Sequence, residues 1–232
     1  MAIFVVPDIH GEYKKLVDIM EKINKVRKPK ETIVFLGDYI DRGDRSKDVV
    51  NYMFELMSND DNVVALLGNH DDEFYNIIER VERLNIYDIE WLSRYCIETL
   101  SSYGVSTLPL KYNSVEDNMR DNFDFIKSEL NKLKESEDYR KFKILMVNCR
   151  KYYKESKYIF SHSGGVSYKP VEKQTVNELI WSRDFKPRKD DYIYVCGHTP
   201  TNSREVEQIG NILMCDVGAV FGVSEIPLIR LD

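Results

Sequence analysis

Short apolar runs alternate with amphipathic stretches over the first 70 residues. Residues 2–6, 33–36 and 63–67 are continuous apolar runs of strand length. From Tyr13 to Val26 the apolar positions recur with a period near 3.6. Residues 49–57 show a second apolar helix face, which we expect Ser46 to cap. The pattern predicts three buried strands separated by two helices.

The middle of the chain has a different pattern. Between Asp71 and Lys157 there is one glycine, Gly104, and one proline, Pro109, and long charged stretches carry apolar residues at helical spacing. We predict a mainly helical insertion over about residues 71–157. Its charge runs are interpreted as solvated faces, with a part in a substrate rim as the alternative.

Strand character returns in the last third of the chain. Residues 158–161, 192–196, 212–215 and 228–231 are apolar runs separated by segments that contain Gly or Pro. Together with the first 70 residues they predict the α/β class. We expect one domain over residues 1–232, with the helical insertion inside it.

Composition excludes several classes of protein. The 232 residues include 33 Lys plus Arg and 39 Asp plus Glu, a net charge of −6, so no basic surface for nucleic acid is expected. No apolar run is long enough for a membrane span or a signal peptide. The four cysteines form no CxxC pair and are expected to be reduced, buried thiols. These features predict a cytoplasmic protein without membrane or nucleic-acid partners, and they leave its oligomeric state open.

Histidine is scarce, and its placement is informative. All four histidines and seven of the eleven glycines lie in five short clusters, each directly after a predicted strand. The clusters are Asp8-Ile9-His10-Gly11, Gly37-Asp38-Tyr39-Ile40-Asp41-Arg42-Gly43, Gly68-Asn69-His70-Asp71, His162-Ser163-Gly164-Gly165 and Gly197-His198-Thr199-Pro200. Glycine permits sharp turns at strand ends, where open α/β sheets form their crevice.

The residue types in these clusters indicate a metal site. Carboxylate, imidazole and amide oxygen together suit divalent ions such as Mn, Fe or Zn. Paired metals need a ligand that bridges them, and such pairs recur in phosphatases and nucleases. Asp38 is the best bridging candidate because its cluster lies between two others.

The five clusters, in this order, resemble the calcineurin-like metallophosphoesterases, and within them the phosphoprotein phosphatases of the bacterial and bacteriophage-lambda type. Trp181-Ser182-Arg183 and residues 216–222 also resemble family segments, so the resemblance spans residues 8–222. The family is related to symmetrical diadenosine tetraphosphate hydrolases. The resemblance implies an α/β/β/α sandwich.

It also implies a role for each cluster. Two divalent metal ions are expected, Mn before Fe or Zn. The first would be bound by Asp8, His10 and Asp38, and the second by Asp38, Asn69, His162 and His198. The phosphoryl oxygens would be bound by Arg42, Arg183 and Asn69. A hydroxide bridging the metals would attack phosphorus. His70 would protonate the leaving group, with its tautomer held by Asp41.

The resemblance leaves two substrate classes open. The first is phosphoserine, phosphothreonine or phosphotyrosine in proteins, and the second is a dinucleoside polyphosphate such as diadenosine tetraphosphate. A nuclease of the superfamily is a weaker alternative, because those branches place a second histidine where this chain has Pro200. Nothing in the sequence supports a scaffold that has lost catalysis.

Several residues depart from the family pattern or stay ambiguous. Asp71 is interpreted as either a partner of a metal ligand or a carboxylate at a helix start, and Asp216 as mainly structural. Pro7 stands where glycine is common, Asp44-Arg45-Ser46 replaces a proline-led loop, and the region after Trp91 lacks a double glycine. These departures bear on substrate fit, since none of them replaces an expected ligand.

Overall fold

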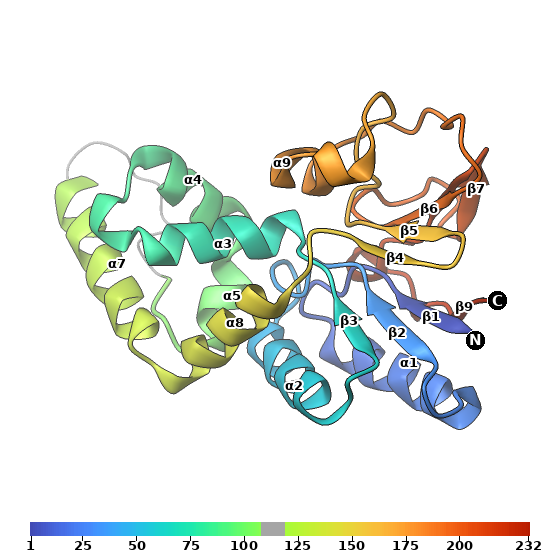
Figure 1. Cartoon of the computed structure of the whole chain (residues 1–232). Helices are drawn as coiled ribbons and strands as arrows, with labels where there is room; N and C mark the ends of the chain where they lie inside the picture. The colour runs from blue at the N-terminus through green and yellow to red at the C-terminus, as the bar shows by residue number, and fades with distance from the viewer. Residues whose placement is uncertain (108–118) are drawn as a thin grey trace.

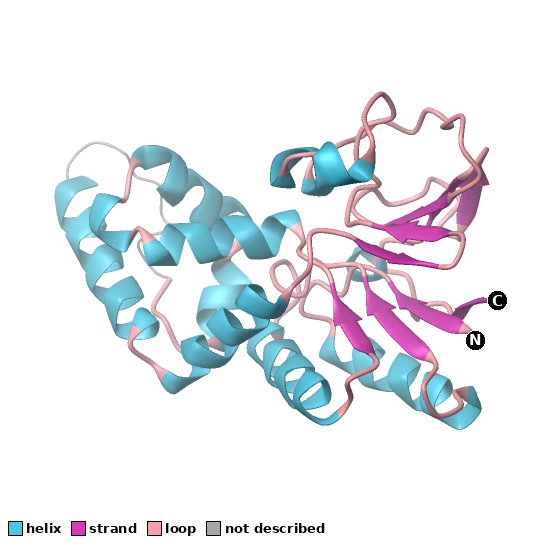
Figure 2. Ribbon diagram, in the orientation of Figure 1, coloured by secondary structure: helices cyan, strands magenta, loops and turns pink. Residues whose placement is uncertain are grey.

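The computed structural model describes residues 1–107 and 119–232, which form two sheets flanked by helices (Figure 1, Figure 2). The first sheet has the order β3-β2-β1-β9. Its strands are β1 (Ile3–Val6), β2 (Thr32–Phe35), β3 (Val63–Ala65) and β9 (Ile229–Leu231). β1, β2 and β3 are parallel, and β9 runs antiparallel to β1. The predicted strands are confirmed, and the last of them lies beside the first.

The second sheet has the order β4-β5-β6-β8-β7. Its strands are β4 (Tyr153–Glu155), β5 (Tyr158–Phe160), β6 (Ile193–Cys196), β7 (Glu207–Ile209) and β8 (Ile212–Met214). The central strands β5, β6 and β8, which the apolar runs predicted, are parallel to one another. β4 and β7 are antiparallel edge strands that the sequence pattern missed. Polar side chains such as Lys154 and Gln208 interrupt them, because one side of an edge strand faces water.

Helices cover the outer faces of both sheets. α1 (Tyr13–Val26) and α2 (Ser46–Asn59) pack on the first sheet, and α9 (Val176–Ile180) packs on the second. The α/β/β/α layers are therefore confirmed. The expected cap is wrong: Ser46 is the first residue of α2, and its buried hydroxyl accepts the N–H of Asp41 at 3.2 Å. Short 3-10 helices in the described loops are η1 (Val81–Arg83), η2 (Val171–Lys173) and η3 (Ala219–Phe221).

The predicted insertion is helical and lies at one end of the sandwich (Figure 1). It contains α3 (Asn69–Glu79), α4 (Ile86–Tyr95), α5 (Ile97–Ser102), α7 (Met119–Lys134) and α8 (Glu137–Asn148). Residues 108–118 of the predicted insertion, with Pro109, lie outside the described residues. The predicted end at residue 157 is wrong, because β4 already belongs to the second sheet.

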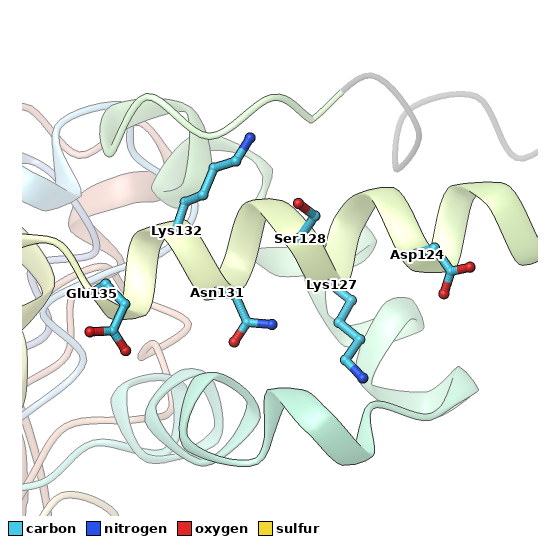
Figure 3. A pocket seen from close by; sticks show the side chains of 6 residues that line it. All are labelled: Asp124, Lys127, Ser128, Asn131, Lys132 and Glu135. Carbon is cyan, nitrogen blue, oxygen red and sulfur yellow. The ribbon is translucent and has the colours of Figure 1, made fainter.

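One charged helix face of the insertion is well defined. Figure 3 shows polar side chains along α7 around a shallow hollow. Lys127 Nζ lies 2.7 Å from Glu82 Oε2, and Asn131 donates to Glu82 Oε1 at 2.9 Å. These pairs join α7 to η1 at the surface, which fits a solvated face.

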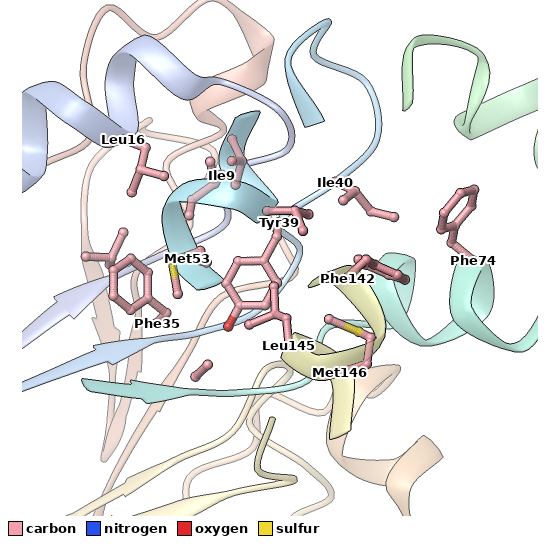
Figure 4. Close-up of a cluster of buried hydrophobic side chains, with 14 of the residues drawn as sticks. Ile9, Leu16, Phe35, Tyr39, Ile40, Met53, Phe74, Phe142, Leu145 and Met146 are labelled. Carbon is pink, nitrogen blue, oxygen red and sulfur yellow. The ribbon is translucent and has the colours of Figure 1, made fainter. Parts of the chain in front are cut away.

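Among the described residues the buried hydrophobic side chains form three clusters, of which one lies between the sheets, one on the outer side of the first sheet and one on the outer side of the second. Val5 and Leu36 of the first sheet pack against Phe160 and Val195 of the second. On the other side of the first sheet, Figure 4 shows a larger cluster that continues from the sheet and α2 into α8. All four cysteines are free; Cys96, Cys196 and Cys215 are buried as expected, whereas Cys149 is only half-buried. No described helix combines the length and apolar character that a bilayer crossing requires.

Candidate active site

The five sequence clusters meet where the carboxyl ends of the parallel strands of both sheets converge. Asp8 and His10 follow β1, Asp38 follows β2, and Asn69 begins α3 directly after β3. His162 and His198 follow β5 and β6 of the second sheet. Parallel strands bring these ends to one edge of each sheet, so the site lies between the two sheets.

Asp38 lies between histidines from the two sheets. Its Oδ2 is 3.4 Å from Nε2 of His10 and 3.4 Å from Nε2 of His162. Nδ1 of His10 donates to the carbonyl of Ile40, and Nδ1 of His162 donates to that of Leu36, each at 2.8 Å. These bonds turn both Nε2 atoms toward Asp38, the arrangement expected of histidine metal ligands.

Asn69 joins the two histidines of the second sheet. Its Oδ1 lies 3.0 Å from Nε2 of His162 and 2.8 Å from Nδ1 of His198. Nε2 of His198 is buried and has no hydrogen-bond partner among the described residues. Asn69 Oδ1 therefore lies beside one ring nitrogen of each histidine, and this combination of amide and imidazole donors suits a divalent cation.

Within the part of the chain that the structure describes, two compact groups of three residues have donor atoms within 4.8 Å of one another. One group is His10, Asp38 and His70, and the other is Asp38, His162 and His198. Asp38 is common to both, which suits a bridging ligand. Asp8 belongs to neither group, although it is buried; its carboxylate accepts the backbone N–H of His198 at 3.0 and 3.1 Å.

The buried histidines and carboxylates of this site have pKa values shifted in different directions. Burial lowers the pKa of His10 and that of His198 to about 3, so both imidazoles are neutral and able to bind a metal. Burial also disfavours a charged His162, but the Asp38 carboxylate outweighs it and raises the pKa of His162 to about 10. Burial and the nearby Asp216 raise the pKa of Asp8 well above its usual value. Crowded buried carboxylates of this kind favour a bound cation.

His70, a member of the first group, also forms a pair with Asp41. Nδ1 of His70 lies 2.8 Å from Oδ2 of Asp41. Arg42 donates to Nε2 of His70 at 3.0 Å and to Nε2 of His10 at 2.5 Å. The rings of Trp91 and Tyr95 pack on His70, with each centroid 5.3 Å from that of the imidazole. The pair leaves Nε2 of His70 beside a guanidinium, as a phosphoryl-binding site would require.

Arg183 approaches from the second sheet. Its Nη1 donates to Oγ1 of Thr199 at 3.2 Å, next to His198 in sequence. The ring of Trp181 lies 6.3 Å from that of His198 and 5.8 Å from that of Trp91. Arg42 and Arg183 therefore lie near different histidines of the site.

Strained backbone is concentrated in the same loops. Eight residues other than glycine have positive φ among those described, and five of them belong to the site clusters: His10, Asp38, Asp41, Arg42 and His198. Such conformations cost of order 1–3 kcal/mol each and persist where the surroundings determine them. Residue type alone does not reveal this conformation in a sequence.

Both interpretations of Asp71 are confirmed: it is a carboxylate at a helix start and a partner of the expected metal ligand Asp38. It lies in the first turn of α3, and its carboxylate accepts the backbone N–H groups of Asp38 at 2.7 Å and Tyr39 at 2.9 Å. Asp216 accepts the N–H of Gly218 at 2.7 Å, a structural contact that leads into η3. In the loop Asp44-Arg45-Ser46, which differs from the family pattern, the guanidinium of Arg45 stacks on the ring of Tyr13 and forms an ion pair with Asp48.

Two side-chain contacts to Asp41 were not predicted from the sequence. Thr99 donates to its Oδ1 at 2.7 Å, and the thiol of Cys96 lies 3.5 Å from its Oδ2. Both residues belong to the insertion and are more than 50 residues away in sequence. No local signal connects them with Asp41.

The fold and the converging histidines and carboxylates define a metallophosphoesterase. The chain belongs to the calcineurin-like phosphoesterase family, which matches residues 1–224. The resemblance seen in the sequence is thereby confirmed.

Individual relatives match shorter segments. A Caenorhabditis elegans protein named "Putative serine/threonine-protein phosphatase" is 36% identical over 75 residues, 32% of this chain and 20% of the relative. The symmetrical bis(5'-nucleosyl)-tetraphosphatase of Escherichia coli is 32% identical over 83 residues, 36% of this chain and 28% of the relative. The matches thus span less than a third of either relative's length.

A solved structure described as a "putative diadenosine tetraphosphatase" shares the fold over the whole molecule. It matches 99% of this chain and 92% of its own, with a TM-score of 0.57 and 16% identity. At this identity the likeness concerns the fold alone.

Proposed function

We propose that the protein is a phosphomonoester hydrolase with a dinuclear metal centre, acting on phosphoserine or phosphothreonine in proteins. The observation that supports it most is the position of Asp38 Oδ2, at 3.4 Å from both His10 and His162. One carboxylate placed between histidines of two sheets suits a bridging ligand.

The proposed ligands are those that the resemblance implied. The first ion would be held by Asp8, His10 and Asp38, and the second by Asp38, Asn69, His162 and His198. Oxygen and imidazole donors without thiolate favour Mn, with Fe or Zn as alternatives. When bound, the ions would lower the pKa of water and offset charge on the phosphoryl oxygens.

The remaining residues bind the phosphate and move a proton. Arg42, next to His10, and Arg183, next to Thr199, would bind phosphoryl oxygens through planar guanidinium groups, and the Asn69 amide would be a further phosphate contact. Asp41 accepts the Nδ1 proton of His70, so the acid would be the imidazolium form of His70, whose second proton, on Nε2, would go to the leaving oxygen. This donation matters most for serine, whose alkoxide is a poor leaving group.

A direct comparison of substrates tests the proposal. Mn-loaded protein is assayed with a phosphoserine peptide and with diadenosine tetraphosphate, and kcat/KM is compared. Faster turnover of the peptide supports the proposal, whereas much faster cleavage of the dinucleotide would overturn it. Asp38→Asn serves as the control, because it should be inactive on both substrates.

The arrangement of Arg42 and a further arginine, Arg204, supports a dinucleoside polyphosphate as the alternative substrate. The guanidinium of Arg42 lies 5.2 Å from the centre of the Phe221 ring, and that of Arg204 lies 5.8 Å from the same centre. Two arginines around one ring would suit a chain of several phosphates. Arg204→Gln should then lower kcat/KM for diadenosine tetraphosphate and leave that for the phosphopeptide unchanged.

We also propose that residues 1–232 act as a single domain. Phe35 of β2 and Phe142 of α8 belong to one buried cluster, so the insertion shares the core of the sandwich (Figure 4). Independent unfolding of the insertion would contradict this.

A further inference from the structure

Both oxygens of the Asp41 carboxylate are held by side chains distant in sequence. Oδ2 accepts the Nδ1 proton of His70 at 2.8 Å, and Oδ1 accepts the hydroxyl proton of Thr99 at 2.7 Å. The thiol of Cys96 is a longer and weaker donor to Oδ2 at 3.5 Å. Asp41, Thr99 and Cys96 are each 0% exposed, so water does not compete for these bonds.

The Thr99 hydroxyl also holds the backbone of Asp41. The N–H of Asp41 donates to Thr99 Oγ1 at 2.9 Å, and Ser46 Oγ lies 3.0 Å from the same atom. A hydroxyl donates one proton and accepts two. Because the Thr99 proton goes to Oδ1, Asp41 N–H and Ser46 fill its two acceptor positions. All the hydrogen-bonding capacity of Thr99 is therefore used around Asp41.

This bonding occurs at a strained position. Asp41 has a φ of 73° and its neighbour Arg42 a φ of 70°, both in the left-handed region. Thr99 bonds Asp41 through the backbone and the carboxylate together, which favours that conformation over ordinary ones. The direction of the carboxylate toward His70 depends on the same turn.

The helical insertion supplies these contacts. Thr99 lies in α5 and Cys96 directly precedes it, while Trp91 and Tyr95 of α4 pack on the His70 ring. The insertion thus reaches the site by two routes: it holds the partner of His70, and it encloses the imidazole itself.

We propose that Thr99 is a positioning residue: it fixes Asp41, which orients His70 with Nε2 toward the leaving oxygen. This inference rests on the proposed function. Thr99 gives up no proton during the reaction, and its contribution is the orientation of the acid. Its loss should therefore slow reactions that need the acid and spare those that do not.

Two leaving groups separate this role from a merely structural one. Thr99→Val removes the hydroxyl at nearly constant shape, and a phosphoserine peptide needs a proton donor whereas p-nitrophenyl phosphate scarcely does. A correctly placed general acid contributes about 10²–10⁴-fold, so we expect a loss of about tenfold or more in kcat for the peptide. We expect KM to change little and kcat for p-nitrophenyl phosphate to fall by less than about threefold.

Three further variants sharpen the test. Thr99→Ser keeps the hydroxyl and should restore turnover of the peptide. Thr99→Ala leaves room for water and should show a smaller loss with the same dependence on the leaving group, which covers the case in which Thr99→Val does not fold. Thr32→Val is the matched control, because Thr32 is also buried and donates to a carboxylate, that of Glu155 at 3.0 Å, but at the far end of β2.

The assays distinguish a failure of the positioning role of Thr99 from a failure of the proposed function. Equal losses on both substrates, or no rescue by Thr99→Ser, would overturn the positioning role. His70→Asn, assayed alongside, tests the acid itself. If His70→Asn retains full turnover of the peptide, the proposed acid is wrong; if only the Thr99 variants retain it, the positioning role alone is wrong.

Discussion

Oδ2 of Asp71 accepts the backbone N–H of Asp38 at 2.7 Å, so the first turn of α3 holds the loop that carries the proposed bridging ligand. Oδ1 of Asp71 accepts the N–H of Tyr39 at 2.9 Å as well. Asp71 is 0% exposed, and both its oxygens are used. Any change at Asp71 is therefore transmitted to the position of Asp38.

Asp71→Asn should weaken both the fold and the site. An amide cannot accept on both sides, so a buried N–H loses its partner, at a cost of about 1–3 kcal/mol in the free energy of unfolding. Loss of such a supporting contact lowers metal affinity by about 10–100-fold. Denaturant unfolding and Mn²⁺ titration measure the two effects. The adjacent Asp72→Asn, at a more exposed position, should change neither; similar behaviour of the two variants would contradict the assignment.

Metal removal should destabilise the protein. Burial and neighbouring carboxylates raise the pKa values of Asp8 and Asp71, so a bound cation would relieve their crowding. At 100 times its Kd a ligand adds about 2.7 kcal/mol. For a chain of this size that corresponds to a rise of roughly 5–10 °C in Tm. Thermal unfolding with EDTA and with Mn²⁺ tests this, and Asp38→Asn should lose most of the response.

Metal affinity should rise with pH because His162 must lose a proton. Its pKa in the metal-free protein is raised to about 10, from an ordinary value of 6.5. The charged pair with Asp38 therefore stabilises the metal-free fold below about pH 6.5, and this contribution is lost as pH rises through about 10. Between these values one proton leaves on binding, so Mn²⁺ affinity should increase about tenfold per pH unit.

Calorimetry in buffers of different ionisation enthalpy measures that proton directly. Titrations between about pH 6.5 and 8.5 stay within the window that the His162 shift defines. An affinity independent of pH there would show that His162 is neutral before the metal binds. His162→Gln should abolish the released proton along with one of the two proposed ions.

His70→Asn should retain both proposed metals and lose turnover of alkyl phosphates. His70 lies within 4.8 Å of His10 and Asp38 donor atoms, so its role as acid rather than ligand needs a measurement. We expect full metal content by elemental analysis and a drop of about 10²–10⁴-fold in kcat for a phosphoserine peptide. His10→Asn should instead lose metal. Loss of metal in His70→Asn would make His70 a ligand.

Much of the fold was predictable because the buried strands are nearly continuous apolar runs. β1, β2, β5 and β6 have apolar residues on both faces, since a sheet or helices cover each side. β4 and β7 were missed because an edge strand needs no such run. Serine is a common helix cap, which is why Ser46 was expected to cap α2. Its hydroxyl instead forms hydrogen bonds with the backbone N–H of Asp41 and with the hydroxyl of Thr99.

The site was predictable only in part. Glycines and histidines after strand ends marked the residues that converge, because chain turns and polar side chains coincide there. The partners of those residues were not visible: Thr99 reaches Asp41 across 58 residues, and His162 reaches Leu36 across 126. Contacts of this kind depend on the packing of separate elements, which local sequence patterns do not encode.

The position of Asp38 between His10 and His162 has a mechanical consequence. The two histidines follow strands of different sheets, so ions shared through Asp38 would fasten one sheet to the other at a single point. Opening of the interface between Val34 and Val195 would then require release of metal. Amide protons of β2 and β6 should therefore exchange more slowly in the loaded protein, which makes the metal content a determinant of the cohesion of the whole sandwich.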